Sequence, residues 1–516
     1  MAFGMSSTGR SAAGPKNVPL HSILLRGSES TTIRSTPPQF ARTGHAGSPF
    51  PTAERNLPVD DVQRPEGTPI IRRVVASTEN VGHFVSPRMS IYTMARRSVV
   101  LALAVAAHAQ SNITAQVVER CPHLANDSAV ACVNNYASVL PYPFVRATAS
   151  NGVDPKNDTF VATSVATDTS FHRLAETTFV VFDRERGLDI LGSAPRLEKV
   201  FETRNDSIHE GPVYVPGLNA IIFSQPHQGV YQQKVINLNG TEPTIGNFTT
   251  VPPVYAVNGG RLYKGKIYWA SEASFSFPSP ENGSTIDQAP GIYELNPYTH
   301  EVRTLLNNYF GQQLNSPNDL VIDSRGDIYF SDSWYGYAIN VTDYPVLKPQ
   351  TYRFRPSTGA VSVVEDSLEQ PNGLGISPDG KTMYISDTGI TDFDGAPEDT
   401  LPRYTFNKFG GRTVYAFDVN FAPPGNYLTN KRPIWYAQTF AVDGMHVSRE
   451  GYVLGASGAG IDVLSEWGDL ILRIEVGGEI NNLQFAGPDR QELWLFGPGG
   501  IWRVSGLKGI HGMVDE

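Results

Sequence analysis

Cysteine is nearly absent from this sequence, with only Cys121 and Cys132 among 516 residues. So low a count excludes a disulfide-rich scaffold and a cysteine-rich zinc domain. Basic residues are also too few to dominate the charge, because 41 Lys and Arg stand against 51 Asp and Glu, for a formal net charge of −10. A nucleic-acid-binding protein needs a basic face, so this balance argues against nucleic acid as a partner.

Several enzyme motifs are missing as well. The sequence contains no G-x-S-x-G nucleophile elbow, no phosphate-binding Walker loop and no H-E-x-x-H zinc helix. Long stretches of helical periodicity are scarce, whereas 48 Gly and 38 Pro supply many turns. The composition therefore predicts a protein built from short strands and turns.

The N-terminal part of the chain differs from the rest in composition. Residues 1–93 hold ten Lys and Arg but six Asp and Glu, with few aromatic residues. Such a segment buries too little apolar surface to offset its ordering entropy, so we expect a disordered leader. In 94–109 a basic start, a short apolar run and an Ala-His-Ala end predict a secretory signal peptide, too short to span a membrane. A buried helix is the alternative for this run.

A signal peptide belongs at an N-terminus, so we expect translation to begin at Met94 or Met89 and residues 1–93 to be a gene-model extension. Two features agree with secretion. Cys121 and Cys132 are close enough in sequence for a local disulfide in an extension at 110–165, with two free thiols as the alternative. Eight Asn-x-Ser/Thr sequons, all after residue 110, are candidate glycosylation sites: Asn112, Asn126, Asn157, Asn205, Asn239, Asn247, Asn282 and Asn340.

One pattern recurs six times along the remaining chain. A polar residue, usually followed by Gly, begins two short alternating strands joined by a tight turn. The copies begin at Glu210, Asn258, Asn318, Asn372, Asp443 and Asn482. Units of this length indicate an all-β protein with a six-bladed β-propeller over 166–510, whereas a pair of β-sandwiches would not explain repeats in phase. We expect the segment 178–182 to complete the last blade.

The repeat phase also predicts a site. The first strand of a propeller blade lines the central channel, so the polar residue of each repeat would converge on the axis. Two carboxylates with several amide oxygens suit a hard divalent cation, and Ca²⁺ accepts such irregular oxygen donors more readily than Mg²⁺. Zinc would need His or Cys in phase, and none is present. The alternative is that these Asn and Asp residues form turns beside their glycines.

Four other residues near the ring are candidates for chemistry or binding. His209 precedes Glu210, and His446 follows Asp443 by three residues, so either could transfer protons. A histidine in an exposed turn is the alternative. Trp334 and Tyr335, in the segment SWYGY, could line a substrate mouth or belong to a packed loop.

Three blocks of sequence resemble the senescence-marker-protein/gluconolactonase superfamily. They are TLLNNYFGQQLNSPNDL at 304–320, QPNGLGISPDGKTMYISDTG at 370–389 and DGMHVSREG at 443–451. Within it the chain is similar to the secreted fungal lactonohydrolases over roughly residues 170–505. The resemblance implies six blades, one axial divalent metal, usually Ca²⁺, and hydrolysis of small lactones such as aldonolactones or pantoyl lactone.

The resemblance also implies roles for single residues. The metal ligands would be Glu210, Asn318, Asn372 and Asp443, and Asn258 would be a substrate or ligand position. Beyond the resemblance, we expect Asp443 or His446 to assist the attacking water as a base, and Asn318, Trp334 and Tyr335 to be further substrate-binding positions. Calcium phosphotriesterases and paraoxonases have similar rings, so an esterase of that kind and a non-catalytic ligand-binding propeller are the alternatives.

Overall fold

The computed structural model describes residues 116–122, 124, 129–146, 159–204, 209–225, 233–272, 276–278, 285–339, 341–393, 404–422 and 425–514, all within one compact unit, Met89–Glu516. The predicted leader, the signal peptide and six of the sequons (Asn112, Asn126, Asn157, Asn205, Asn282 and Asn340) lie outside these residues. The other two sequon asparagines, Asn239 and Asn247, are exposed. Within the described ranges no helix has the length and apolar character needed to cross a membrane.

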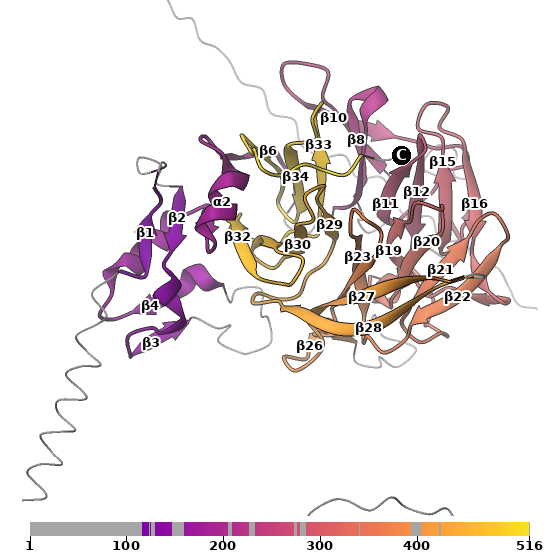
Figure 1. Cartoon of the computed structure of the whole chain (residues 1–516). Helices are drawn as coiled ribbons and strands as arrows, with labels where there is room; N and C mark the ends of the chain where they lie inside the picture. The colour runs from indigo at the N-terminus through magenta and orange to yellow at the C-terminus, as the bar shows by residue number, and fades with distance from the viewer. Residues whose placement is uncertain are drawn as a thin grey trace, which may run out of the picture. The chain divides into compact units, whose positions relative to one another are not determined.

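Short runs of β-branched and aromatic residues form the strands (Figure 1). β8 (Ala220–Ser224) and β20 (Ile328–Asp332) read AIIFS and IYFSD, and both are buried along their whole length. A strand inside a sheet that is covered on both faces tolerates such continuous apolar runs. Glycines close several hairpins, among them Gly380 at φ +69°, a conformation that other residues rarely adopt.

Five sheets have four antiparallel strands each. In sheet order, the strands are β7 (Glu210–Val215), β8, β9 (Gln233–Asn237) and β10 (Thr244–Phe248); β11 (Val257–Tyr263), β12 (Lys266–Ser271), β15 (Gly291–Leu295) and β16 (Val302–Leu306); β19 (Pro317–Ile322), β20, β21 (Gln350–Arg355) and β22 (Ala360–Glu365); β23 (Pro371–Ile376), β24 (Thr382–Asp387), β27 (Thr413–Ala422) and β28 (Gly425–Tyr436); and β33 (Asn482–Ala486), β34 (Glu492–Gly497), β35 (Gly500–Ser505) and β6 (Arg196–Glu202).

A further sheet has seven strands, because N-terminal strands extend it. Its order is β29 (Met445–Val447), β30 (Val453–Ser457), β31 (Gly460–Leu464), β32 (Leu470–Glu475), β5 (Phe179–Val181), β2 (Val130–Val133) and β1 (Val118–Arg120). β5 pairs antiparallel with β32 and parallel with β2. These strands cover the edge of β32 that would otherwise remain unpaired.

The innermost strands of successive sheets contact one another, and β33 returns to β7, so the sheets form an all-β propeller. The prediction of six blades is corrected: the structure has five four-stranded blades, not six, and the fifth sequence repeat belongs to the seven-stranded sheet. The prediction for the segment 178–182 is also wrong. Its strand, β5, extends the seven-stranded sheet, and β6 completes the last blade instead, pairing with β35.

Shorter elements lie between and beside the blades. The short strands are β3 (Phe144–Arg146) with β4 (Thr163–Val165), β13 (Ser276–Pro278) with β14 (Thr285–Asp287), β17 (Asn308–Tyr309) with β18 (Gln312–Gln313), and β25 (Thr391–Phe393) with β26 (Tyr404–Phe406). The helices are α2 (Arg184–Leu191), α3 (Tyr335–Ala338), and the 3₁₀ segments η1 (Asn135–Ser138), η3 (Phe160–Ala162), η4 (Thr169–Glu176) and η5 (Pro216–Leu218).

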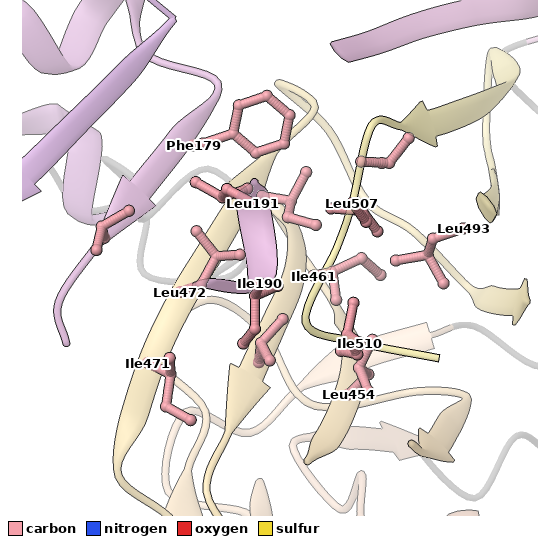
Figure 2. Packing of buried hydrophobic residues seen from close by; sticks show 14 of the residues in the cluster. Phe179, Ile190, Leu191, Leu454, Ile461, Ile471, Leu472, Leu493, Leu507 and Ile510 are labelled. Atoms are coloured by element: carbon pink, nitrogen blue, oxygen red, sulfur yellow. The ribbon is translucent and has the colours of Figure 1, made fainter. Parts of the chain in front are cut away.

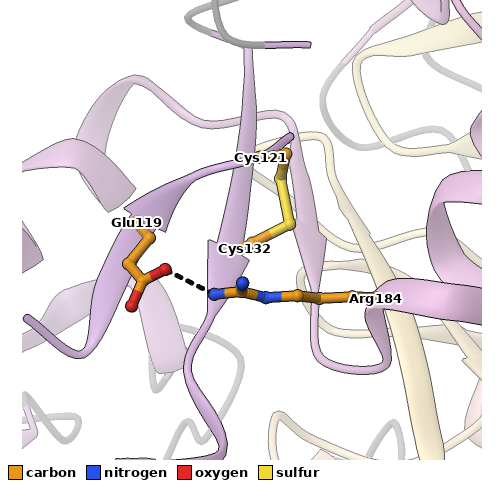
Figure 3. The surroundings of a disulfide bond; sticks show 4 residues. All are labelled: Glu119, Cys121, Cys132 and Arg184. Atoms are coloured by element: carbon orange, nitrogen blue, oxygen red, sulfur yellow. Dashed lines mark hydrogen bonds and ion pairs between the residues drawn. A yellow bond between two sulfur atoms is a disulfide. The ribbon is translucent and has the colours of Figure 1, made fainter. Parts of the chain in front are cut away.

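The N-terminal extension is closed on itself by a disulfide, and ionic and apolar contacts fasten it to the propeller. A disulfide joins Cys121 to Cys132, and beside it Arg184 of α2 forms an ion pair with Glu119 at 2.5 Å (Figure 3). The largest apolar cluster holds residues of the extension together with α2 and the strands β30–β34 (Figure 2). The extension is therefore part of the same packed body as the propeller.

Candidate active site

Irregularities at the start of the inner strands set the direction of the site residues. The register between the first and second strands shifts within Glu210–Val213, Val257–Gly259, Pro317–Leu320 and Pro371–Leu374. A β-bulge re-aims side chains and interrupts pairing, and it recurs here at the polar position of four repeats. The polar residues therefore project from bulges at the same end of four neighbouring sheets.

The glycines of the Asn-Gly pairs have a packing role rather than a turn role. A Cβ on Gly259 would lie 2.5 Å from the carbonyl oxygen of Asn318, and a Cβ on Gly373 would clash with the carbonyl oxygen of Asp443. Each glycine thus lets one inner strand approach the next repeat closely. The interpretation of these Asn residues as turn formers does not fit this arrangement, because they lie at the bulged start of strands.

The polar residues of five repeats meet in one cavity of about 290 Å³. Its polar lining includes the predicted Glu210, Asn258, Asn318, Asn372 and Asp443, with Tyr335 of α3. In the sixth repeat Asn481 lines the cavity, while Asn482 lies behind it and donates a hydrogen bond from Nδ2 to Glu210 Oε2 at 2.9 Å. The structure thus brings the polar residues of five repeats to one cavity, together with the neighbour of the polar residue in the last repeat.

Glu272 is a carboxylate of this cavity that the sequence analysis missed. It follows the second strand of its sheet, β12, whereas the repeated polar position lies at the start of the first strand. Thr388 also lines the cavity and follows the second strand β24 in the same way. The residue just after the second strand was therefore the signal that could have revealed Glu272.

Amide groups hold the carboxylates in place. Asn258 donates from Nδ2 to Glu272 Oε1 at 3.0 Å, and Asn481 donates from Nδ2 to Asp443 Oδ2 at 3.2 Å. Hydrogen bonds to an ionised carboxylate favour its charged form, but burial opposes that form. Carboxylates held this way keep a fixed orientation toward the cavity.

Burial and mutual repulsion shift the acidity of this cluster. Burial, and then the charge of Asp443, raise the pKa of Glu210 well above its usual range, against the hydrogen bond from Asn482. Burial raises the pKa of Glu272 to about 8, and Asp443 adds to this shift. No Lys or Arg lines the described part of the cavity. These buried carboxyl groups therefore favour the protonated form unless a cation offsets their charge, and the described lining supplies no protein cation to do so.

The donor set suits a hard divalent cation. Asn318 Oδ1 is buried and has no hydrogen-bond partner among the described residues, so it is an acceptor available to a cation. Glu210, Asn372 and Asp443 supply further oxygen donors around the same cavity. The described chain holds no metal-binding group made of three or more His, Cys, Asp or Glu residues. Any cation held here would thus depend on amide as well as carboxylate oxygens.

The structure does not bring the two histidines or Trp334 to this cavity. His446 lines a second cavity with Arg261, and burial, with Arg261 adding to it, lowers the pKa of His446 well below its usual value. His209 is buried, its Nδ1 lies 3.0 Å from the Gly497 carbonyl oxygen, and burial lowers its pKa to about 4. Trp334 lines a third cavity, and its Nε1 donates to the Leu347 carbonyl at 3.2 Å.

Comparisons with known proteins agree with this geometry. Residues 208–496 match the SMP-30/gluconolactonase/LRE-like region. The chain is 39% identical over 389 residues to the lactonohydrolase oryL of Aspergillus oryzae, covering 74% of this chain and 86% of that protein. It is 34% identical over 469 residues to lactonohydrolase oryH of the same species, covering 79% of this chain and 97% of that protein.

A solved structure assigned as a gluconolactonase superposes with a TM-score of 0.52 at 21% sequence identity, covering 65% of this chain and all of the other. At that identity the likeness supports the fold alone. The matched region begins just before β7 and ends within β34, so it contains the inner strands and every residue that lines the cavity except Pro498. With the sequence blocks, the fold and two such relatives in agreement, the chain belongs to the SMP-30/gluconolactonase/LRE-like family.

Proposed function

We propose that this protein is a lactone hydrolase that works with one divalent cation, best matched by Ca²⁺. The observation that carries the proposal is the convergence of Glu210, Asn318, Asn372 and Asp443 from four repeats on one cavity. The relatives of this chain are named lactonohydrolases and a gluconolactonase. Function follows from a site rather than from a fold, and this site offers oxygen donors and a carboxylate base together.

These four residues would hold the cation, since buried oxygen donors of mixed charge suit Ca²⁺. A cation bound there would polarise the lactone carbonyl and stabilise the negative charge that develops on its oxygen. Asn258 and Tyr335 would contact the substrate, because both line the same cavity. The bulged strands and the amide–carboxylate pairs preorganise these groups before substrate enters.

Asp443 would act as the base. Its carboxylate would take a proton from the attacking water, whose oxygen forms a bond to the carbonyl carbon. The ring C–O bond then breaks, and the same proton passes to the departing ring oxygen, which yields the hydroxy acid. The hydrogen bond from Asn481 at 3.2 Å would fix the orientation of Asp443 during this exchange. His446 has no part in this step, because it lines a different cavity.

We propose that the protein is secreted. The signal-peptide pattern at 94–109 and the eight sequons support this, and a disulfide is typical of proteins that fold in an oxidising compartment. Mass spectrometry of culture medium tests the proposal. A mature N-terminus near residue 110 is the expected result, whereas peptides from residues 1–88 in the secreted protein would contradict it.

The function is tested with the full purified chain on glucono-δ-lactone, pantoyl lactone, δ-octalactone, phenyl acetate and paraoxon. We expect turnover of at least one lactone, loss of that turnover after chelation, and recovery with Ca²⁺ beyond that with Mg²⁺ or Zn²⁺. Asp443→Asn should reduce turnover by at least a hundredfold, as typical for a general base. Asp379→Asn is the matched control, because Asp379 is an exposed turn residue.

Each contrary outcome identifies a different error. Hydrolysis of paraoxon or phenyl acetate without any lactone turnover would favour the esterase alternative. A folded protein with no turnover of any substrate would favour the ligand-binding alternative. Full activity of Asp443→Asn would reject Asp443 as the base. Undiminished lactone turnover in protein shown by elemental analysis to be metal-free would reject the role of the cation.

A further inference from the structure

Part of the cavity lining is apolar, and we call this part the apolar wall. Ile339, Phe406, Phe440 and Pro498 form it, opposite in character to the carboxylates and amides of the inner strands. The rings of Phe406 and Phe440 lie nearly perpendicular, with centroids 6.0 Å apart, and both pack against buried Ile390 and Ala441. This apolar wall is therefore a packed surface rather than a set of loose side chains.

The backbone of Phe440 adopts an unusual conformation. Its φ is +58°, in the left-handed region that a bulky residue rarely occupies. The neighbouring backbone is held from two sides, since Gly458 N–H donates to the Thr439 carbonyl at 3.2 Å and Arg146 donates to the Gln438 carbonyl at 2.8 Å. Such strain persists only where the surroundings enforce it, and such positions cluster at functional sites. Here it places an aromatic ring on the cavity wall.

Two hydroxyl groups of the cavity lining, those of Tyr335 and Thr388, are already used within the protein. Tyr335 donates its hydroxyl proton to Thr388 Oγ1 at 2.7 Å, and Thr388 donates to the Gln370 carbonyl at 3.0 Å. Neither proton is available to a substrate hydroxyl without breaking a bond. An aldonolactone carries hydroxyl groups on most ring carbons, and hydroxyls buried against an apolar wall lose their hydrogen bonds to water uncompensated.

We propose that the cavity selects lactones that carry an apolar alkyl or aryl substituent, and that Phe406 and Phe440 determine this selection. The inference rests on the proposed lactone hydrolysis and names its substrate class. The lactone group faces the carboxylates and amides, while the substituent packs on the two phenyl rings. Each methylene buried there contributes about a fourfold gain in kcat/KM, because burial is worth about 0.8 kcal/mol per CH₂.

The test compares kcat/KM for three δ-lactones on the full chain: unsubstituted δ-valerolactone, δ-octalactone with its propyl substituent, and polyhydroxylated glucono-δ-lactone. We expect δ-octalactone to exceed δ-valerolactone by about tenfold or more, and glucono-δ-lactone to be the poorest of the three. Phe440→Asn should reduce the preference for δ-octalactone by about tenfold, since Asn tolerates the left-handed backbone but offers no apolar surface.

Phe310→Asn is the matched control, because Phe310 also has a positive φ, +50°, and is 82% exposed outside the cavity. It should leave all three kcat/KM values unchanged. If Phe440→Asn fails to fold, as judged by its thermal melt, Phe406→Ser provides the same comparison with an ordinary backbone. The inference would be overturned if the wild type prefers glucono-δ-lactone. It would also be overturned if Phe440→Asn and Phe406→Ser each lower kcat/KM by the same factor for all three substrates. Absence of any lactone turnover would instead reject the proposed function itself.

Discussion

Glu475 lies at the end of β32 in a buried charged cluster, and replacing it with Gln tests how the extension and the propeller are joined. Its Oε1 accepts a hydrogen bond from Thr159 of the extension at 3.1 Å. Arg473 is fully buried and is already paired with Asp462 at 2.6 Å, while its Nη1 lies 4.0 Å from Glu475. The second carboxylate therefore adds buried negative charge that Arg473 compensates only partly.

Burial raises the pKa of Glu475 to about 7 from 4.5, although Arg473, Thr159 and the more distant Arg146 lower it and Asp462 raises it further. The folded protein therefore retains a proton that the unfolded chain releases above pH 4.5. The unfolding free energy therefore falls by about 3 kcal/mol as the pH rises from 4.5 to 7, and the stability present below pH 4.5 is lost over this range. Gln resembles the protonated carboxyl and cannot ionise, so Glu475→Gln should lack this loss.

The measurement is urea unfolding of wild type and Glu475→Gln at pH 4.5, 6 and 8. The two free energies should nearly coincide at pH 4.5, and the variant should be more stable by about 3 kcal/mol at pH 8. Glu466→Gln is the matched control, since Glu466 is exposed in the turn before the same strand. It should follow the wild-type pH profile.

Parallel pH profiles for wild type and Glu475→Gln would show that Glu475 does not hold a proton in the folded state. A variant less stable than wild type at pH 8 would mean that the ionised carboxylate is a needed partner of Arg473. Either result would refute the interpretation that burial decides the state of this group.

Three further predictions concern the extension and the proposed cation site. In steady-state kinetics, Arg146→Ala should raise KM for δ-octalactone severalfold with kcat little changed, because Arg146 donates to the Gln438 carbonyl two residues before Phe440. Arg146→Lys, which keeps a donor, should show a smaller rise in KM. Cys121→Ser with Cys132→Ser should lower the unfolding free energy by about 3 kcal/mol in urea titrations, since the bond closes a short loop; an unchanged midpoint would contradict this. Asn318→Leu should abolish the rise in melting temperature on adding Ca²⁺, whereas Asn318→Asp, which keeps an oxygen donor, should retain it.

The inner ring could be predicted from the sequence because propeller repeats place equivalent residues at equivalent points. Glu210, Asn258, Asn318 and Asn372 each begin a first strand or stand at its second residue, and all four line the cavity. The same reasoning failed for His446. It lies three residues after Asp443, in β29, and it lines the second cavity instead of the one that Asp443 lines. Spacing alone did not encode this change of direction.

The blade count was harder to predict than the site. Strand patterns locate hairpins, but they do not say which outer strand completes which sheet. Both β5 and β6 are short apolar or mixed runs before the first repeat, and only their pairing with β32 and β35 distinguishes them. Such non-local pairings depend on the register and packing of the finished ring, which no short window of sequence contains.

The repeat pattern did not predict the apolar wall either, because the residues of this wall come from segments outside the repeating hairpins. Ile339 follows α3, Phe406 ends β26, and Phe440 lies between β28 and β29. The extension that supports Phe440 lies outside the region shared with the family, residues 208–496. The inner strands thus carry the polar groups for the reaction, and the segments between the repeating hairpins shape the apolar wall. Substrate preference should therefore respond to changes in Arg146 and the 437–441 loop, while the reaction itself depends on the inner strands.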